Sequence, residues 1–198
     1  MRVIINNTKG GVIAHTARRL FHIGMLAIPF IYYYFLTSLA SEKILHLLIL
    51  AFIFLVFLVE KIRIRWKLVV FGQRLHEATH ISAFAWTVLS LGIILIVSPS
   101  LAFSIPIIAS CALADPLLGE MRARGVNKKI AFFSGIVLVF LIWFFCALHY
   151  HFSFWIAFLM APLTIAVEWP TFKWIDDNAL MLLVPTIMTL LIDAAFFK

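Results

Sequence analysis

Residues 130–148 read IAFFSGIVLVFLIWFFCAL, a stretch without a charged side chain. As an α-helix this stretch is about 28 Å long, because each residue adds about 1.5 Å, and it matches the roughly 30 Å hydrocarbon core of a bilayer. Six further runs are also strongly apolar and cover residues 22–40, 44–59, 81–97, 100–114, 152–167 and 179–197; the fourth of the seven runs is short, and the last contains one charged residue, Asp193. The sequence therefore predicts an all-α, polytopic integral membrane protein with about seven transmembrane helices.

The composition of the whole chain agrees with this class of protein. Of its 198 residues, 64% are hydrophobic and only 13% are charged, and the mean hydropathy is +1.08. Soluble domains are much less apolar, so a soluble fold is excluded, and we expect no nucleic-acid partner. No linker or compositional break separates the apolar runs, and we expect a single domain over residues 1–198.

Lys and Arg are distributed unevenly between the predicted loops. Fourteen of the 16 basic residues precede the first apolar run or follow the second, fourth and sixth, whereas Lys43 and Lys198 fall on the other side. Cytoplasmic loops are enriched in Lys and Arg, so this asymmetry places the N-terminus in the cytoplasm. Most other polar motif residues fall at the same face. We therefore expect an active site on the cytoplasmic face of a bacterial inner membrane or an endoplasmic-reticulum-type membrane.

Two motifs precede the first and third apolar runs. ARRLFH places Arg18 and His22 four residues apart on one helix face, with Arg19 beside them. The arginines are typical of anchors that bind lipid headgroups, whereas an ionisable His22 one turn inside a span is a functional candidate. QRLHEATH contains Arg74 and Glu77, which are spaced to pair along a helix as a structural ion pair or an anion clamp.

The segment ADPLLGEMRARGVNKK, residues 114–129, follows the fourth apolar run. It contains Asp115, then Gly119, and ends with Lys129. Glycines allow a backbone to approach a phosphate and basic side chains neutralise one, but the segment also reads as an ordinary cytoplasmic turn. The spacing of a P-loop or of a dinucleotide-binding fingerprint is absent.

The segment EWPTFKWIDDNALMLLVP, residues 168–185, joins the last two runs. Glu168 closes the sixth run, and Asp176, Asp177 and Asn178 open the seventh. Asp and Asn are preferred at helix N-termini, so capping accounts for their presence. With Asp115 on the same face, these carboxylates also suit a magnesium ion that carries nucleotide phosphates. The two interpretations are compatible, because a helix N-terminus also binds anions.

Together these motifs resemble those of the CTP-dependent lipid kinases. That family includes dolichol kinase, phytol kinase and the CTP-using diacylglycerol kinase, and it is related to the phosphatidate cytidylyltransferases. The resemblance runs from about Arg18 to Pro185, and its most specific part is DDNALMLLVP. One loop departs from the family pattern: Lys129 is kept, but Ile130 replaces a hydroxyl residue and Phe133 a glycine.

The resemblance implies transfer of the γ-phosphate of CTP to the hydroxyl of a membrane lipid alcohol of the polyprenol or dolichol type, with Mg²⁺ or another divalent cation. It also implies a role for each motif residue. The metal ligands would be Asp115, Glu168 and Asp177; the nucleotide-binding residues Arg18, Arg19, Arg74, Gly119, Lys129 and Asn178; and the catalytic residues His22, Glu77 and Asp177.

Two alternatives stay open at this stage. A cytidylyltransferase would join CMP to a lipid phosphate, although the HGG-x-x-DR-x-D signature of those enzymes is absent. A non-enzymatic lipid-binding protein would use the same charges only to hold headgroups. Prolines inside the runs, such as Pro29 and Pro185, indicate kinked helices and a groove in which a lipid keeps its tail in the membrane. The sequence leaves open whether the protein forms a homo-oligomer.

Overall fold

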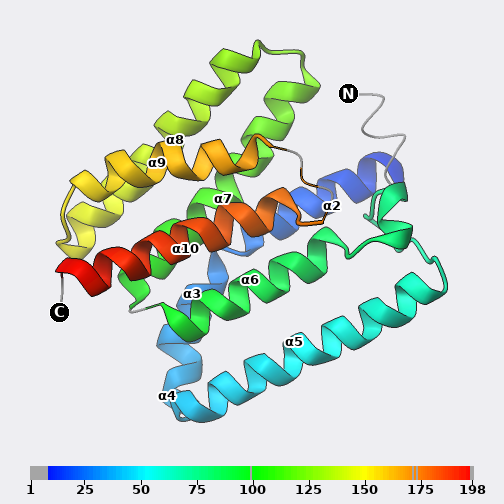
Figure 1. The fold of residues 1–198 in the computed structure, drawn as a ribbon, viewed down its shortest axis with the longest axis horizontal. Helices are drawn as coiled ribbons and strands as arrows, with labels where there is room; N and C mark the ends of the chain where they lie inside the picture. Colours follow the sequence, from blue (N-terminus) through cyan, green and yellow to red (C-terminus); the bar gives the residue numbers. More distant parts are fainter. Residues whose placement is uncertain (1–8, 99, 171, 173, 197–198) are drawn as a thin grey trace.

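The computed structural model describes residues 9–98, 100–170, 172 and 174–196, and all regular structure in these ranges is helical (Figure 1). The chain forms α2 (Gly11–Gly24), α3 (Ala27–Phe30), the π-helix η1 (Ile31–Leu36), α4 (Thr37–Leu39), α5 (Glu42–Arg65), the 3₁₀-helix η2 (Leu75–Thr79), α6 (Ala83–Val97), α7 (Leu101–Ala123), α8 (Lys128–Tyr150), α9 (Trp155–Glu168) and α10 (Asp177–Phe196). The predicted all-α class is confirmed.

Five helical stretches in the described residues are long and apolar enough to cross a membrane. They are Gly11–Leu39, which includes α2 to α4, and then α5, α7, α8 and residues Asp177–Ala195 of α10. The two remaining predicted spans correspond to α6 and α9, which are apolar but shorter. The protein is therefore an integral membrane protein with five candidate spans.

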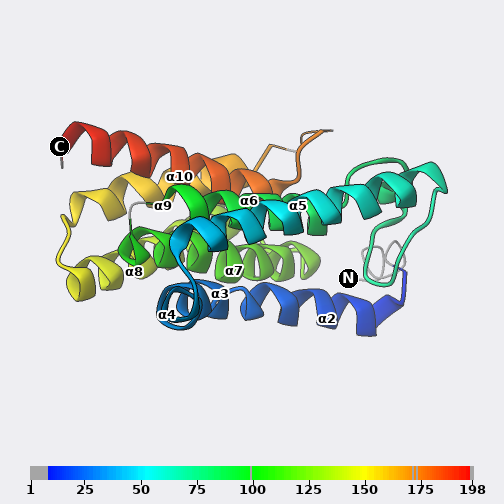
Figure 2. The same ribbon diagram turned by 90° about the horizontal axis from the view of Figure 1, so that it is seen from below.

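Helix α7 lies at the centre of the bundle. It packs against α2, α3, α6, α8, α9 and α10, and Figure 2 shows it between α2 on one side and α10 on the other. Ala109, Ala112 and Ala114 on α7 are buried, and such small side chains let neighbouring helices approach closely. This close packing brings the ends of α2, α9 and α10 to the same helix.

Helix α5 lies at the lower edge of the bundle in Figure 1 and packs mainly on α6 and η2. Only 6% of its apolar window is buried, so most of its surface is available to lipid. At the contact with α6, a Cβ added to Gly92 would lie 2.5 Å from Ile53 Cδ1. The glycine therefore sets how closely the two helices approach.

Two predicted helix boundaries are wrong. The first helix begins at Gly11 rather than residue 22, and Met25 and Leu26 separate α2 from α3. Pro29 explains this break, because a proline ring clashes with the carbonyl four residues earlier, here that of Met25. The fourth helix ends at Ala123 rather than residue 114. Its last turns contain Leu, Glu, Met, Arg and Ala, which are strong helix formers, so the first charged residue does not end the helix.

Candidate functional site

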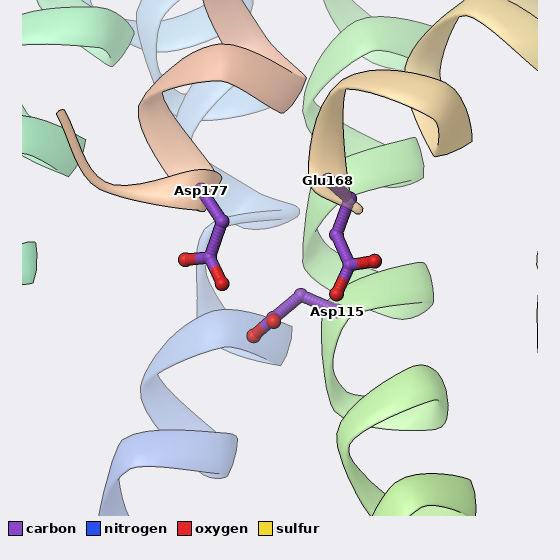
Figure 3. Close-up of side chains that lie close together, drawn as sticks. All are labelled: Asp115, Glu168 and Asp177. Atoms are coloured by element: carbon purple, nitrogen blue, oxygen red, sulfur yellow. The ribbon is translucent and has the colours of Figure 1, made fainter. Parts of the chain in front are cut away.

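Three carboxylates from three different helices meet at one point of the bundle (Figure 3). Asp115 lies on α7, Glu168 is the last residue of α9, and Asp177 is the first residue of α10. One carboxylate oxygen from each lies within 4.8 Å of those of the other two. The structure thus brings together the three residues for which the resemblance implies a metal-binding role.

The local sequence explains why two helices end and begin here. Trp169 and Pro170 follow Glu168, and α9 ends here because Pro170 has no backbone N–H to continue the helical hydrogen bonds. Asp176 caps α10: its carbonyl accepts from the N–H of Ala179, and its Oδ1 accepts from the N–H of Asn178 at 3.1 Å. Asp177 Oδ1 lies 3.1 Å from the same N–H. Since Asp176 caps the helix, Asp177 can face the other two carboxylates.

His22 on α2 is buried against this cluster. Its Nε2 lies 3.1 Å from Asp115 Oδ2 and 3.3 Å from Asn178 Oδ1, and its Nδ1 lies 3.1 Å from the carbonyl oxygen of Arg18. Both ring nitrogens therefore face oxygen atoms. Asn178 is also close to Cys111, whose Sγ lies 3.8 Å from the Asn178 carbonyl oxygen and which is fully buried. The contacts hold α2, α7 and α10 together at the site.

Two buried polar groups at the site lack hydrogen-bond partners among the described residues. Glu168 is 1% exposed, and its Oε1 forms an ion pair with Arg122 Nη2 at 2.5 Å. The other carboxylate oxygen of Glu168, Oε2, accepts no hydrogen bond from the described residues. Asn178 is fully buried, and its Nδ2 donates to no acceptor. Buried polar groups are normally satisfied, because an unmet one costs on the order of 1 to 3 kcal/mol. The two groups are therefore suited to a ligand that supplies a cation and an acceptor.

Two arginines of α2 pair with glutamates outside the cluster. Arg18 Nη1 lies 3.9 Å from Glu77 Oε1, and Arg19 forms an ion pair with Glu120. The predicted side-chain pair between Arg74 and Glu77 is replaced by a capping box, in which the Arg74 backbone N–H donates to Glu77 Oε1 at 3.2 Å. The segment forms a short 3₁₀-helix rather than the start of an α-helix, so the Glu77 carboxylate reaches the backbone and Arg18 instead.

The surroundings of Asp176, just before the start of α10, shift its pKa. Burial, and then the neighbouring charge of Asp177, raise the pKa of Asp176 to about 7, while Arg18 and Arg74 act in the opposite direction. Asp176 is thus a buried carboxyl group beside a second carboxylate, and the ionised form of this pair is disfavoured. A cation bound nearby would favour the ionised form.

Gly119 lies one helical turn after Asp115 on α7, whereas Lys129 lies in the first turn of α8. Gly119 is helical within α7, not in a loop, and a Cβ added there would meet no atom within 4 Å, so its face of the helix is open. Lys129 is exposed in the first turn of α8 and forms no ion pair with any described carboxylate. The segment predicted as a loop is helical as far as Ala123, and phosphate binding by Gly119 and Lys129 stays a prediction.

Arg122 is a site residue that the sequence reasoning missed. It lies seven residues after Asp115, which is two helical turns, and so falls on the same face of α7. The spacing of Asp115 and Arg122 in the sequence indicates this position only if the helix is predicted to continue past residue 114.

The chain matches no family model, and no curated protein or solved structure is significantly similar to it. Three carboxylates with a free buried oxygen suit a hard divalent cation, and the arginines of α2 and η2 suit phosphate groups.

Proposed function

We propose that the protein is a membrane-embedded kinase that transfers the γ-phosphate of CTP to the hydroxyl of a polyprenol-type or related lipid alcohol, with Mg²⁺. One observation carries this proposal: Asp115, Glu168 and Asp177 meet within 4.8 Å, beside a buried Glu168 oxygen and an Asn178 amide that lack partners. Metal-dependent phosphoryl transfer relies on positioning and charge stabilisation, which such a cluster can supply.

In this proposal each group has a separate task. The three carboxylates would hold Mg²⁺, which would supply positive charge to the phosphates. Arg18 and Arg74 would bind the phosphate oxygens, and the unpartnered Asn178 Nδ2 would donate to the nucleotide. Arg19 forms an ion pair with Glu120 and adds positive charge.

The proposed step balances as follows. The lipid oxygen forms a bond to the γ-phosphorus of CTP, and the bond from that phosphorus to the β–γ bridging oxygen breaks, so that CDP leaves. The hydroxyl proton passes to the Glu77 carboxylate, which is buried near Arg18, while His22, whose ring nitrogens both face oxygen atoms, positions the hydroxyl. The products are a lipid monophosphate and CDP.

The proposal includes an orientation in the membrane. The stretch Gly11–Leu39 and each of the six later helices α5 to α10 would cross, with the N-terminus in the cytoplasm. The end of α5 and the starts of α6 and α10 lie toward the same side of Figure 1 as the start of α2, which supports this arrangement. Arg63 and Arg65 at the end of α5 agree with a cytoplasmic position.

The test is a product assay on purified protein in detergent. Each of four nucleotides is combined with dolichol, undecaprenol, phytol or diacylglycerol, and both the lipid and the nucleotide products are identified. We expect CTP to yield a lipid monophosphate and CDP. A CDP-lipid with pyrophosphate, made from a lipid phosphate, would instead identify a cytidylyltransferase, and no nucleotide consumption with any lipid would contradict an enzymatic role.

A matched pair of variants ties the activity to the cluster. Asp177→Asn keeps a helix-capping side chain but removes an anionic ligand, so turnover should fall by on the order of a hundredfold or more. Asp193→Asn changes a carboxylate on the same helix outside the cluster and should leave turnover near that of the wild type. Equal activities of the two variants would overturn the assignment of Asp177.

A further inference from the structure

A cavity of about 570 Å³ lies between α2, α5 and the segment from residue 70 to α6. Its volume is within the range of small-molecule sites, which are roughly 300 to 1,000 Å³. Apolar side chains form most of its surface, and the three walls come from different parts of the chain.

One wall is a single face of α5. Phe52, Leu55, Val56 and Val59 line the cavity and recur at intervals of three or four residues, which places them on one side of the helix. Because α5 packs mainly on α6 and η2 and is otherwise exposed, this wall separates the cavity from the lipid phase by one helix.

The opposite wall leads to the carboxylate site. Arg18, His22 and Glu77 line the cavity, and the Nε2 atom of His22 is also 3.1 Å from Asp115 Oδ2. The same histidine thus borders both the apolar cavity and the carboxylate cluster. A molecule in the cavity with a polar head at His22 would present that head to the cluster.

Two charged residues in the cavity wall are already neutralised. Arg63 donates to both carboxylate oxygens of Glu60, at 2.9 and 2.7 Å, and to the carbonyl oxygens of Leu68 and His80. Glu60 Oε1 also accepts from the backbone N–H of Ser82. This network joins α5 to the start of α6 and offers no free charge to an occupant, so the cavity is suited to a hydrocarbon chain.

From these contacts we infer that the cavity binds the first part of a single long hydrocarbon chain of the lipid alcohol, with the hydroxyl at His22 and the remaining chain passing beside α5 into the bilayer. The inference rests on the proposed kinase function for the identity of the head group. Transfer of a chain from lipid to an apolar cavity is nearly neutral in free energy, so the shape of the cavity decides which lipids fit. Chain length beyond the cavity should affect the rate only weakly.

Two substitutions on α5 form a matched test. Leu55 lines the cavity and Leu58 does not, although both are partly exposed leucines on the same helix. Leu55→Trp should fill the cavity and raise the KM for the lipid alcohol about tenfold or more, as expected from the usual cost of overpacking, whereas Leu58→Trp should change it less than about twofold. Metal-induced thermal stabilisation of each variant checks that the carboxylate site remains folded.

A direct binding measurement keeps this test separate from the kinase proposal. A long-chain alcohol with a photoreactive diazirine near its hydroxyl is cross-linked to the wild-type protein in detergent, without nucleotide, and the labelled peptides are identified. We expect label on residues 52–59 of α5 or 83–87 of α6. The label should be lost when unlabelled alcohol competes for the cavity, and also in the Leu55→Trp variant, whose side chain fills the cavity.

The possible results separate the two proposals. If the alcohol labels the cavity but no nucleotide is consumed, the kinase function is wrong, whereas the cavity remains the binding site of the lipid. Phosphorylation of the alcohol with label only on the outer faces of α8 or α9, and equal KM values for the two Trp variants, would retain the kinase and overturn the cavity as the lipid site.

Discussion

Replacing Asp177 by Asn should stabilise the metal-free protein and, at the same time, abolish its stabilisation by Mg²⁺ or Mn²⁺. The Asp177 carboxylate lies within 4.8 Å of those of Asp115 and Glu168 and forms no ion pair with any described residue, whereas those two pair with His22 and Arg122. Asn has nearly the same shape and caps a helix about as well as Asp. The substitution therefore removes mainly a negative charge.

The magnitude follows from the separation of the carboxylates. Two unit charges 4.8 Å apart repel by about 3 kcal/mol at an effective dielectric constant of about 20. His22 and Arg122 offset part of this repulsion, so we expect a gain of about 1 to 3 kcal/mol, or a rise of several °C in Tm for a chain of this size. For the wild type, an ion at 100 times its Kd adds about 2.7 kcal/mol, and for the variant it should add almost nothing.

Thermal unfolding followed by tryptophan fluorescence in one detergent measures both effects. Wild type, Asp177→Asn and Asp193→Asn are compared in EDTA and in increasing MnCl₂ or MgCl₂. Asp193→Asn should keep the wild-type response, because Asp193 lies outside the cluster. If Asp177→Asn lowers the Tm in EDTA and retains the wild-type response to the metal, Asp177 acts only as part of the helix start and the metal site is wrong.

Three further outcomes follow from the packing and the charge distribution. Arg63→Ala leaves the buried Glu60 carboxylate without its partner and should cost about 3 to 5 kcal/mol of stability, most of which the double substitution Glu60→Gln/Arg63→Met should recover in the same unfolding assay. Gly92→Leu should lower the Tm by separating α5 from α6, whereas Gly24→Leu, at a position where a Cβ meets no atom within 4 Å, should change it little. A membrane-impermeant maleimide applied from outside should label Ser41→Cys but neither Lys67→Cys nor Arg124→Cys, and labelling of the last two would contradict the proposed orientation.

The sequence was sufficient to anticipate that Asp115, Glu168 and Asp177 would lie together. Each follows or precedes an apolar run at an end that the distribution of basic residues assigns to one side of the membrane. Helix ends on the same side of a bilayer lie at a similar depth, so their polar side chains are concentrated in one thin layer. Because the chain has only 198 residues, this layer is small and the three carboxylates lie close to one another.

The same reasoning could not locate Arg122 or the cavity. Hydropathy identifies where an apolar run ends, but α7 continues for two more turns beyond that point, and Arg122 depends on this continuation. Helix α5 is apolar on all sides, so its sequence does not indicate which face turns toward α2. That choice depends on the approach of α5 to Gly92 and on the Glu60–Arg63 network, which are properties of the packed structure.

Cys111 gives the chain a chemical reporter of its own. The thiol is fully buried on α7, one turn before Asp115, and is 3.8 Å from the backbone oxygen of Asn178 on α10. An alkylating reagent can reach this sulfur only when the helices packed around α7 open locally, so the modification rate under native conditions measures the free energy of that opening. Cys146 is partly exposed on α8 and serves as an internal standard within the same molecule. Every ligand that draws the two helices together should slow the reaction at Cys111 and leave the rate at Cys146 unchanged.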